Sequence, residues 1–237
     1  MAVDQKPFDD PKVRRAFNYA VNREELNERL MEGSHILAKG VLPPGMPGFN
    51  PDLKSYTYDP EKAKDLLKEA GYENGLSVTL ACTENKAQIT LAKGIAEQLA
   101  RIGVQVTLHI SDGNSHYTAV RAGEHAFFHA IWAGDYPDPD NFLYNLFSSD
   151  NFGAKGNYTH YKNDEVDSWL WAARRTLSPK DRIELYRKAE QQIVDDAPWL
   201  FLYYDNTDLL ALPEVQGLKL AFLGYYLTPL TEVWKTE

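Results

Sequence analysis

The sequence predicts an α/β fold in which a mixed sheet is flanked by helices. Strand–helix–strand order recurs twice between residues 76 and 132, an order typical of sheets with helices packed against them. At 237 residues the chain is long enough to bury a sizeable core. Its hydrophobic content of 43% and charged content of 25% are ordinary for a globular protein.

Capping residues set the helix boundaries. Asp10 and Asp59 each precede a proline, which combines an N-cap with a residue suited to the first helical position. Asn22, with Glu25 three residues later, resembles a capping box and predicts a second helix soon after the first. The ranges expected to be helical are 11–21, 22–31, 60–70, 86–102, 115–121, 138–147, 164–176 and 179–195.

Strands are predicted where apolar residues alternate with polar ones or form short apolar runs. Residues 104–110 alternate, so that Val104 and Leu108 share one face of a strand. Residues 33–58 are rich in turn-forming residues and are expected to be irregular. The ranges expected to be strands are 77–81, 104–110, 127–132, 200–204 and 209–212.

Composition excludes some classes of partner. A net charge of −9 argues against a nucleic-acid surface, because phosphate binding needs clustered lysine and arginine. The single cysteine, Cys82, cannot form an internal disulfide and is expected to pack as a small apolar residue. No apolar run in the sequence is long enough for a transmembrane helix, and none resembles a signal peptide.

The most informative segment is Ile131 to Phe142, which reads IWAGDYPDPDNF. An apolar run ends at a glycine turn, and Asp138 with the proline after it then begins a helix. Such a strand-to-helix turn is where open α/β sheets place groups that bind ligands. The turn presents Asp135 between Trp132 and Tyr136, which suits a cationic group with an apolar neighbour, such as the amino end of a peptide.

Three further segments carry a family resemblance. Residues 7–23 read PFDDPKVRRAFNYAVNR, residues 58–72 read YDPEKAKDLLKEAGY, and residues 161–172 read YKNDEVDSWLWA. Together with the 131–142 segment, they resemble the C-terminal half of the peptide-type solute-binding proteins of ABC importers. The resemblance implies one lobe of a two-lobed periplasmic binding protein, whose lobes close over an extended peptide like a hinged trap.

The resemblance also implies roles for the turn. Asp135 would pair with the α-amino group of a bound peptide in a charge-assisted hydrogen bond, Trp132 would line the cleft, and Tyr136 is a weaker candidate. The alternatives are a turn aspartate that bonds local amides and a tryptophan that packs in the core. Two departures from the family pattern, Ala126 and Ile131, place the ligand class in question, since Ile131 fills space beside the expected cleft.

The resemblance further predicts domain organisation and partners. We interpret residues 1–6 as an expression start or linker, residues 7–210 as the ligand-binding lobe, and residues 211–237 as a tail that returns to a missing N-terminal lobe. The tail aromatics Phe222, Tyr225, Tyr226 and Trp234 would then be exposed, repacked or paired with a second copy. Partners would be a peptide, an ABC transporter permease and the missing lobe, with location in the periplasm or at the outer face of the cytoplasmic membrane.

No cofactor is implied, and other functions stay open. His125 and His129 lie four residues apart, but in a strand they would stand about 13 Å apart, so metal binding is not preferred. A carrier of another solute, such as a metal chelate, haem or an oligosaccharide, is the nearest alternative. A hydrolase that uses Asp135 with Asp138 or Asp140 belongs to a different class, as does a sensor module that shares this fold. No motif of nucleophilic or metal-dependent catalysis is present.

Overall fold

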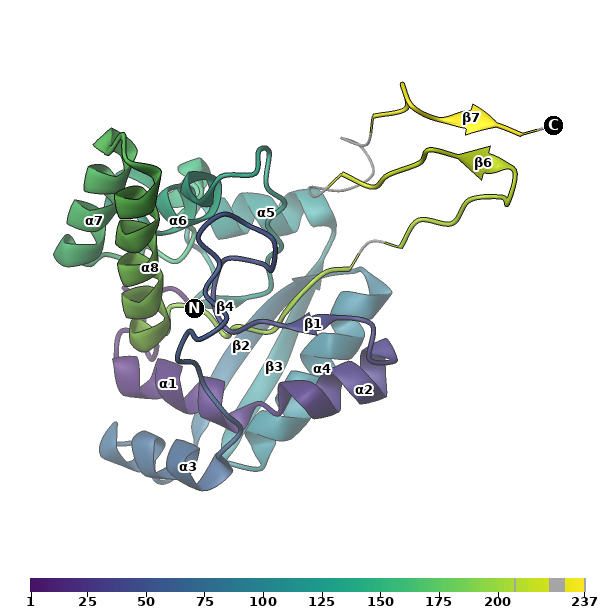
Figure 1. Ribbon diagram of the computed structural model, residues 1–237. Helices are drawn as coiled ribbons and strands as arrows, with labels where there is room; N and C mark the ends of the chain where they lie inside the picture. Colours follow the sequence, from purple (N-terminus) through teal and green to yellow (C-terminus); the bar gives the residue numbers. More distant parts are fainter. Residues whose placement is uncertain (207, 222–228, 237) are drawn as a thin grey trace.

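The computed structural model describes residues 1–206, 208–221 and 229–236, and it has the predicted α/β architecture (Figure 1). Three parallel strands form the main sheet in the order β3–β2–β4, and antiparallel pairing occurs separately in β1–β5 and β6–β7. The helices are α1 (Pro11–Ala20), α2 (Arg23–Met31), α3 (Pro60–Glu69), α4 (Lys86–Ala100), α5 (Gly113–Arg121), α6 (Pro139–Phe147), α7 (Asp164–Arg175) and α8 (Pro179–Asp196). The strands are β1 (Ile36–Leu37), β2 (Leu76–Thr83), β3 (Val104–Ser111), β4 (Phe127–Phe128), β5 (Tyr203–Tyr204), β6 (Val215–Gln216) and β7 (Trp234–Lys235).

The predicted helices are confirmed to within two residues at their ends, and those with a predicted cap begin at it, whereas α5 begins at Gly113 rather than 115. The side chains of Asp10, Asn22 and Asp59 each accept a hydrogen bond from a main-chain amide in the first turn of α1, α2 and α3. Ser178 does the same for α8. These contacts satisfy amides that have no partner within the helix, which is why short polar residues are favoured there.

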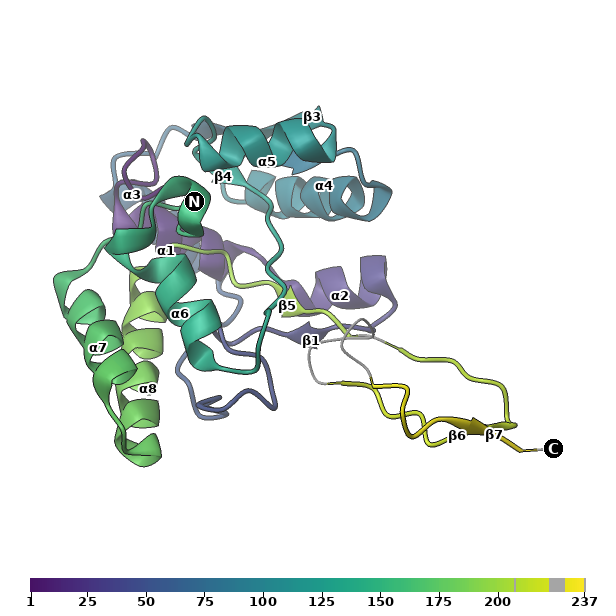
Figure 2. The same cartoon turned by 90° about the horizontal axis from the view of Figure 1, so that it is seen from above.

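One hydrophobic core lies between the sheet and the helices on one of its faces. Val78, Leu80 and Cys82 alternate along β2 and are buried with residues of α1 and α4. The cysteine therefore packs as a small apolar residue, as predicted. Figure 2 shows α4 and α5 near β3 and β4, and each of these two helices contacts both β2 and β3.

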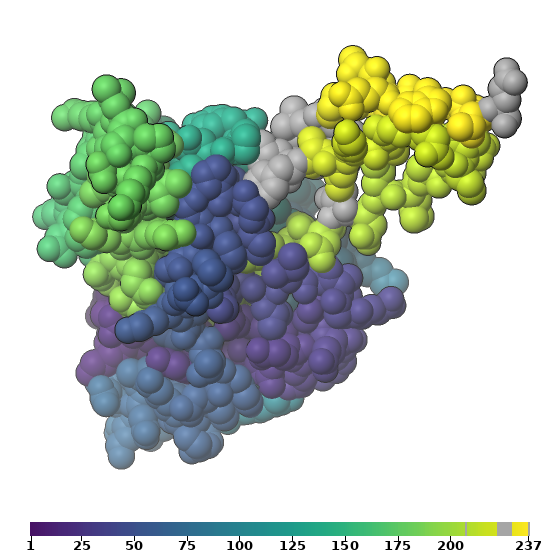
Figure 3. All heavy atoms as spheres, in the orientation of Figure 1, coloured from purple at the N-terminus to yellow at the C-terminus, as the bar shows by residue number. Residues whose placement is uncertain are grey.

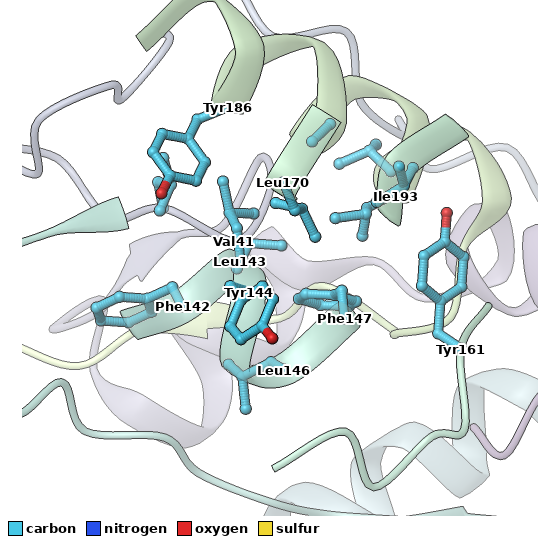
Figure 4. Packing of buried hydrophobic residues seen from close by; sticks show 14 of the residues in the cluster. Val41, Phe142, Leu143, Tyr144, Leu146, Phe147, Tyr161, Leu170, Tyr186 and Ile193 are labelled. Atoms are coloured by element: carbon cyan, nitrogen blue, oxygen red, sulfur yellow. The ribbon is translucent and has the colours of Figure 1, made fainter. Parts of the chain in front are cut away.

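A second core lies among α6, α7 and α8. Large side chains of these helices pack around Leu143 and Leu170, and Figure 4 shows Val41, from the segment after β1, inserted among them. The cluster therefore joins the helical part of the lobe to the irregular segment 38–56.

Three strand predictions are corrected. The strand expected over 127–132 pairs with β2 only at Phe127–Phe128, because the chain then leaves the sheet towards α6. The strand expected over 200–204 is reduced to β5, which pairs with the two residues of β1. Residues 209–212 form no strand, and Leu210 is 95% exposed without a pairing partner among the described residues.

The two ends of the chain differ in their packing. Met1 and Ala2 are buried, and the Ala2 amide donates to the carbonyl of Ala126, so the first residues of the chain pack onto the main body. By contrast, β6 and β7 project from the main body, and Trp234 is 58% exposed (Figure 3). The other tail aromatics named in the sequence lie outside the described residues. No helix within the described ranges is long and apolar enough to cross a membrane.

Candidate functional site

The chain between β4 and α6 forms one wall of a cleft. After the His129 amide donates to the Ala81 carbonyl at 2.8 Å, the backbone leaves the sheet and runs without regular structure to Gly134. Residues 127–134 line the cleft together with parts of segments 36–44 and 199–206. The cleft has a volume of about 620 Å³. A cavity of this size is typical of a site for a small molecule or a short peptide.

The described lining is mainly apolar and contains no lysine or arginine. Asp205 is a charged side chain within it, and its carboxylate lies 3.2 Å from His35. Ile131 also lines the cleft and is 48% exposed, as its position in the sequence suggested. This wall therefore favours apolar or positively charged groups over anionic ones.

Asn141 organises the turn that carries the predicted site residues. It is fully buried in the first turn of α6, and its side-chain oxygen accepts from the Trp132 indole N–H at 3.1 Å and from the Asp135 amide at 3.3 Å. Its side-chain nitrogen donates to the Asp135 carboxylate at 3.4 Å. One buried amide thus fixes both the tryptophan and the aspartate, as a pre-formed site requires.

Trp132 and Asp135 are brought together, but Tyr136 is not. Trp132 is half-buried, lines the cleft and packs against the α6–α8 core. Asp135 is exposed and follows the cleft-lining Gly134, but it is not itself among the residues that line the cleft. Asn141 holds one of its carboxylate oxygens. Tyr136 is 43% exposed, and among the described residues its ring has no hydrogen bond or ring contact with the other two side chains.

The neighbouring aspartates have structural roles. Asp138 caps α6 and forms two hydrogen bonds with the Arg182 guanidinium, at 2.7 and 2.8 Å. Burial would raise the pKa of Asp138, but the bonds from Arg182 and from the Asp140 amide outweigh burial and lower it. Asp140 lies 3.2 Å from Arg174. Since both carboxylates are held in ion pairs, neither is poised to act with Asp135 in acid–base catalysis.

His125 and His129 lie in different surroundings. His129 is half-buried in the cleft lining, and burial, aided by His116, lowers its pKa to about 4. His125 instead has its ring centroid 5.0 Å from that of His109 and 6.4 Å from that of His116. Within the part of the chain that the structure describes, no three histidine, cysteine or acidic side chains are placed to hold a metal ion.

Known proteins match this chain over nearly all of its length. Residues 1–154 match the family described as bacterial extracellular solute-binding proteins, family 5 Middle. The chain is 36% identical over 227 residues to the dipeptide-binding protein of Escherichia coli, an alignment that covers 94% of this chain and 42% of that protein. It is 33% identical over 228 residues to heme-binding protein A of Haemophilus influenzae, with the same two coverages.

Solved structures agree with the sequence matches. The chain superimposes on the periplasmic binding protein DppA from Helicobacter pylori, in complex with the peptide STSA, with a TM-score of 0.90 and 33% identity. The match covers 100% of this chain and 46% of DppA. The chain therefore spans less than half the length of the relatives it matches.

Proposed function

The chain belongs to the family 5 bacterial extracellular solute-binding proteins, and from this we propose that it is a ligand-binding lobe of a carrier for ABC import of peptides. The carrier would act in the periplasm or at the outer face of the cytoplasmic membrane, and it would deliver its ligand to a transporter permease. Capture is non-covalent, and the matched relatives are named as binding proteins.

Asp135 carries the proposal. Asp135 is exposed and directly follows the cleft-lining Gly134, Asn141 holds one of its carboxylate oxygens, and the described cleft lining contains no lysine or arginine that would compete for a carboxylate. A peptide ammonium placed there would gain a charge-assisted hydrogen bond, and Trp132 would cover the adjacent apolar part of the ligand. A second lobe that closed over the pair would exclude water and strengthen the bond.

Replacing Asp135 with asparagine is expected to weaken binding of a free-amine peptide to the two-lobed protein at least about tenfold, because a neutral amide does not pair with an ammonium. Calorimetry with the peptide and with its N-acetylated form measures this effect. The acetylated peptide should bind weakly to the original protein and be insensitive to the substitution. Asp164→Asn, at an exposed position in α7 that is 92% accessible, removes the same charge and serves as the control. Equal affinities for Asp135→Asn and the original protein would refute the role of the aspartate.

The 237-residue chain by itself is expected to fold but to bind peptide weakly or not at all. It provides one wall of the cleft, and backbone hydrogen bonds from a second lobe would be absent. Titration of a di- or tetrapeptide into this chain should give no heat consistent with a micromolar dissociation constant. Micromolar binding would show that one wall is sufficient.

A carrier of another solute remains the alternative. Heme-binding protein A is among the relatives, and the apolar lining of the cleft would suit a large apolar ligand as well as a peptide. A thermal-shift screen of the two-lobed protein with peptides, haem, metal chelates and oligosaccharides separates these classes. Stabilisation by haem but not by peptides would favour the alternative.

A further inference from the structure

The part of the cleft lining formed by Gly40 and Val41 is held from behind by a buried carboxylate. Gly40 and Val41 line the cleft, and Glu190 approaches this segment from α8, where it is only 1% exposed. One Glu190 oxygen, Oε1, accepts hydrogen bonds from the amides of Val41 and Leu42, at 2.9 and 2.8 Å. Two successive amides of the wall therefore depend on one side chain 148 or more residues away.

The rest of the wall leaves little freedom around this contact. The Tyr204 hydroxyl donates to the Gly40 carbonyl at 2.9 Å, and the Gly40 amide lies 3.4 Å from the same hydroxyl. A Cβ atom on Gly40 would lie 2.7 Å from Glu190 Oε1 and closer still to Leu53, so a glycine is required for the approach. Val41 packs into the α6–α8 core in Figure 4, which ties the wall to the same helix that carries the carboxylate.

The second oxygen of Glu190, Oε2, is buried and has no hydrogen-bond partner among the described residues. Burying a carboxylate in such a place costs more free energy than burying an uncharged residue of the same shape. Its presence therefore indicates a role that requires an acceptor. Burial raises the pKa of Glu190 to about 7, although the Leu42 and Val41 amides and the Arg187 charge act in the opposite direction. The charge of Arg187, also on α8, lowers the pKa of Glu190. The charge of Glu190 in turn raises the pKa of the Tyr204 hydroxyl on β5.

We propose that Glu190 is a positioning residue for the ligand-facing wall, and that the protonation state of its carboxyl sets how firmly Gly40–Leu42 is held. The charged form is the stronger acceptor for the two amides. Protonation at Oε2 weakens both bonds without breaking them, since Oε1 still accepts. The wall is then firmest in the deprotonated protein and looser in mildly acidic conditions. The inference uses the proposed function only in taking the cleft as the ligand site.

Amide resonances of Val41 and Leu42 test this without any ligand. In a pH titration from 5 to 9 followed by NMR, both amide protons of the original chain should shift with one shared midpoint near pH 7, upfield as the carboxyl gains its proton. Glu190→Gln should abolish the titration at both residues while leaving the rest of the spectrum folded. Glu184→Gln, at an exposed position of the same helix, should leave the titration unchanged.

Hydrogen exchange separates positioning from general stability. Glu190→Ala removes the acceptor and should speed exchange of these two amides at least about tenfold more than it speeds exchange in β2. Ile193→Ala, also in the core of α8, should accelerate the two regions alike. A titration that persists in Glu190→Gln, flat amide shifts in the original chain, or equal acceleration in both alanine variants would overturn the proposal. None of these outcomes depends on peptide binding, so the proposed function stands or falls separately.

Discussion

Replacing Arg23 with alanine is expected to lower the free energy of unfolding by about 3–5 kcal/mol, because it removes three hydrogen bonds from a half-buried charged donor, each worth roughly 1.5–3 kcal/mol before solvent exposure is discounted. The guanidinium of Arg23, at the start of α2, donates to the carbonyls of Ala38, Tyr56 and Phe201. These carbonyls belong to three segments far apart in the sequence, two of which continue into the cleft wall. Loss of the side chain leaves all three carbonyls without this donor, and an alanine cannot fill the space.

The Arg23→Ala result is measurable as a fall of roughly 10 °C in melting temperature for a chain of this length. Arg29→Ala on the same helix is the matched control, because Arg29 pairs with Glu97 at the surface, where both side chains are largely exposed. Surface ion pairs contribute little, so this control should change stability by less than about 1 kcal/mol. Equal losses for the two variants would mean that the Arg23 contacts are not retained in solution.

The helices could be predicted because their signals are local. Asp10, Asn22, Asp59 and Ser178 bond to amides two or three residues away, and nothing distant is needed to make those caps form. The start of the strand at Phe127 could be predicted, but its length could not, because the length depends on where β2 ceases to offer a pairing partner. The apolar character of residues 127–132 predicted a strand as far as Trp132, but Trp132 lies in the cleft wall.

The candidate site was accessible to sequence reasoning only in part. Trp132 and Asp135 were found from a strand–turn–helix motif and a family resemblance, and the structure places both beside Asn141. Asn141 was not predicted as a site residue. It stands between Asp140 and the apolar residues that begin at Phe142, and nothing in that local sequence separates a buried polar side chain from a solvated one.

Other contacts left no local signal. His109, His116 and His125 come from three different elements, so their proximity depends on how α5 packs on the sheet. Glu190 gave no signal at all, because a glutamate in an amphipathic helix usually faces solvent. Its burial depends on the path of the segment after β1, and residues 33–58 lack any periodicity from which that path could be predicted.

The unusual environment of Glu190 leads to a pH dependence of stability that is opposite to the common one for acidic residues. Its pKa is raised from 4.5 to about 7 in the folded chain, so between these values the folded state binds more protons than the unfolded state. The stabilisation is complete below about pH 4.5 and is lost as the pH rises through 7. The full difference corresponds to about 3 kcal/mol, because each pKa unit is worth about 1.4 kcal/mol.

Glu190→Gln should remove this dependence. A glutamine imitates the protonated carboxyl, since its oxygen still accepts from Val41 and Leu42 and its NH₂ lacks an acceptor as the acid O–H does. Urea unfolding at pH 5 should therefore find similar stabilities for the variant and the original chain. At pH 8 the variant should be more stable by up to about 3 kcal/mol. Taking the difference between the two proteins cancels the contributions of the other titratable groups. Parallel stability curves would mean that Glu190 is already solvated or paired. A variant less stable than the original chain at pH 8 would mean that the charge strengthens the two amide hydrogen bonds by more free energy than its burial costs.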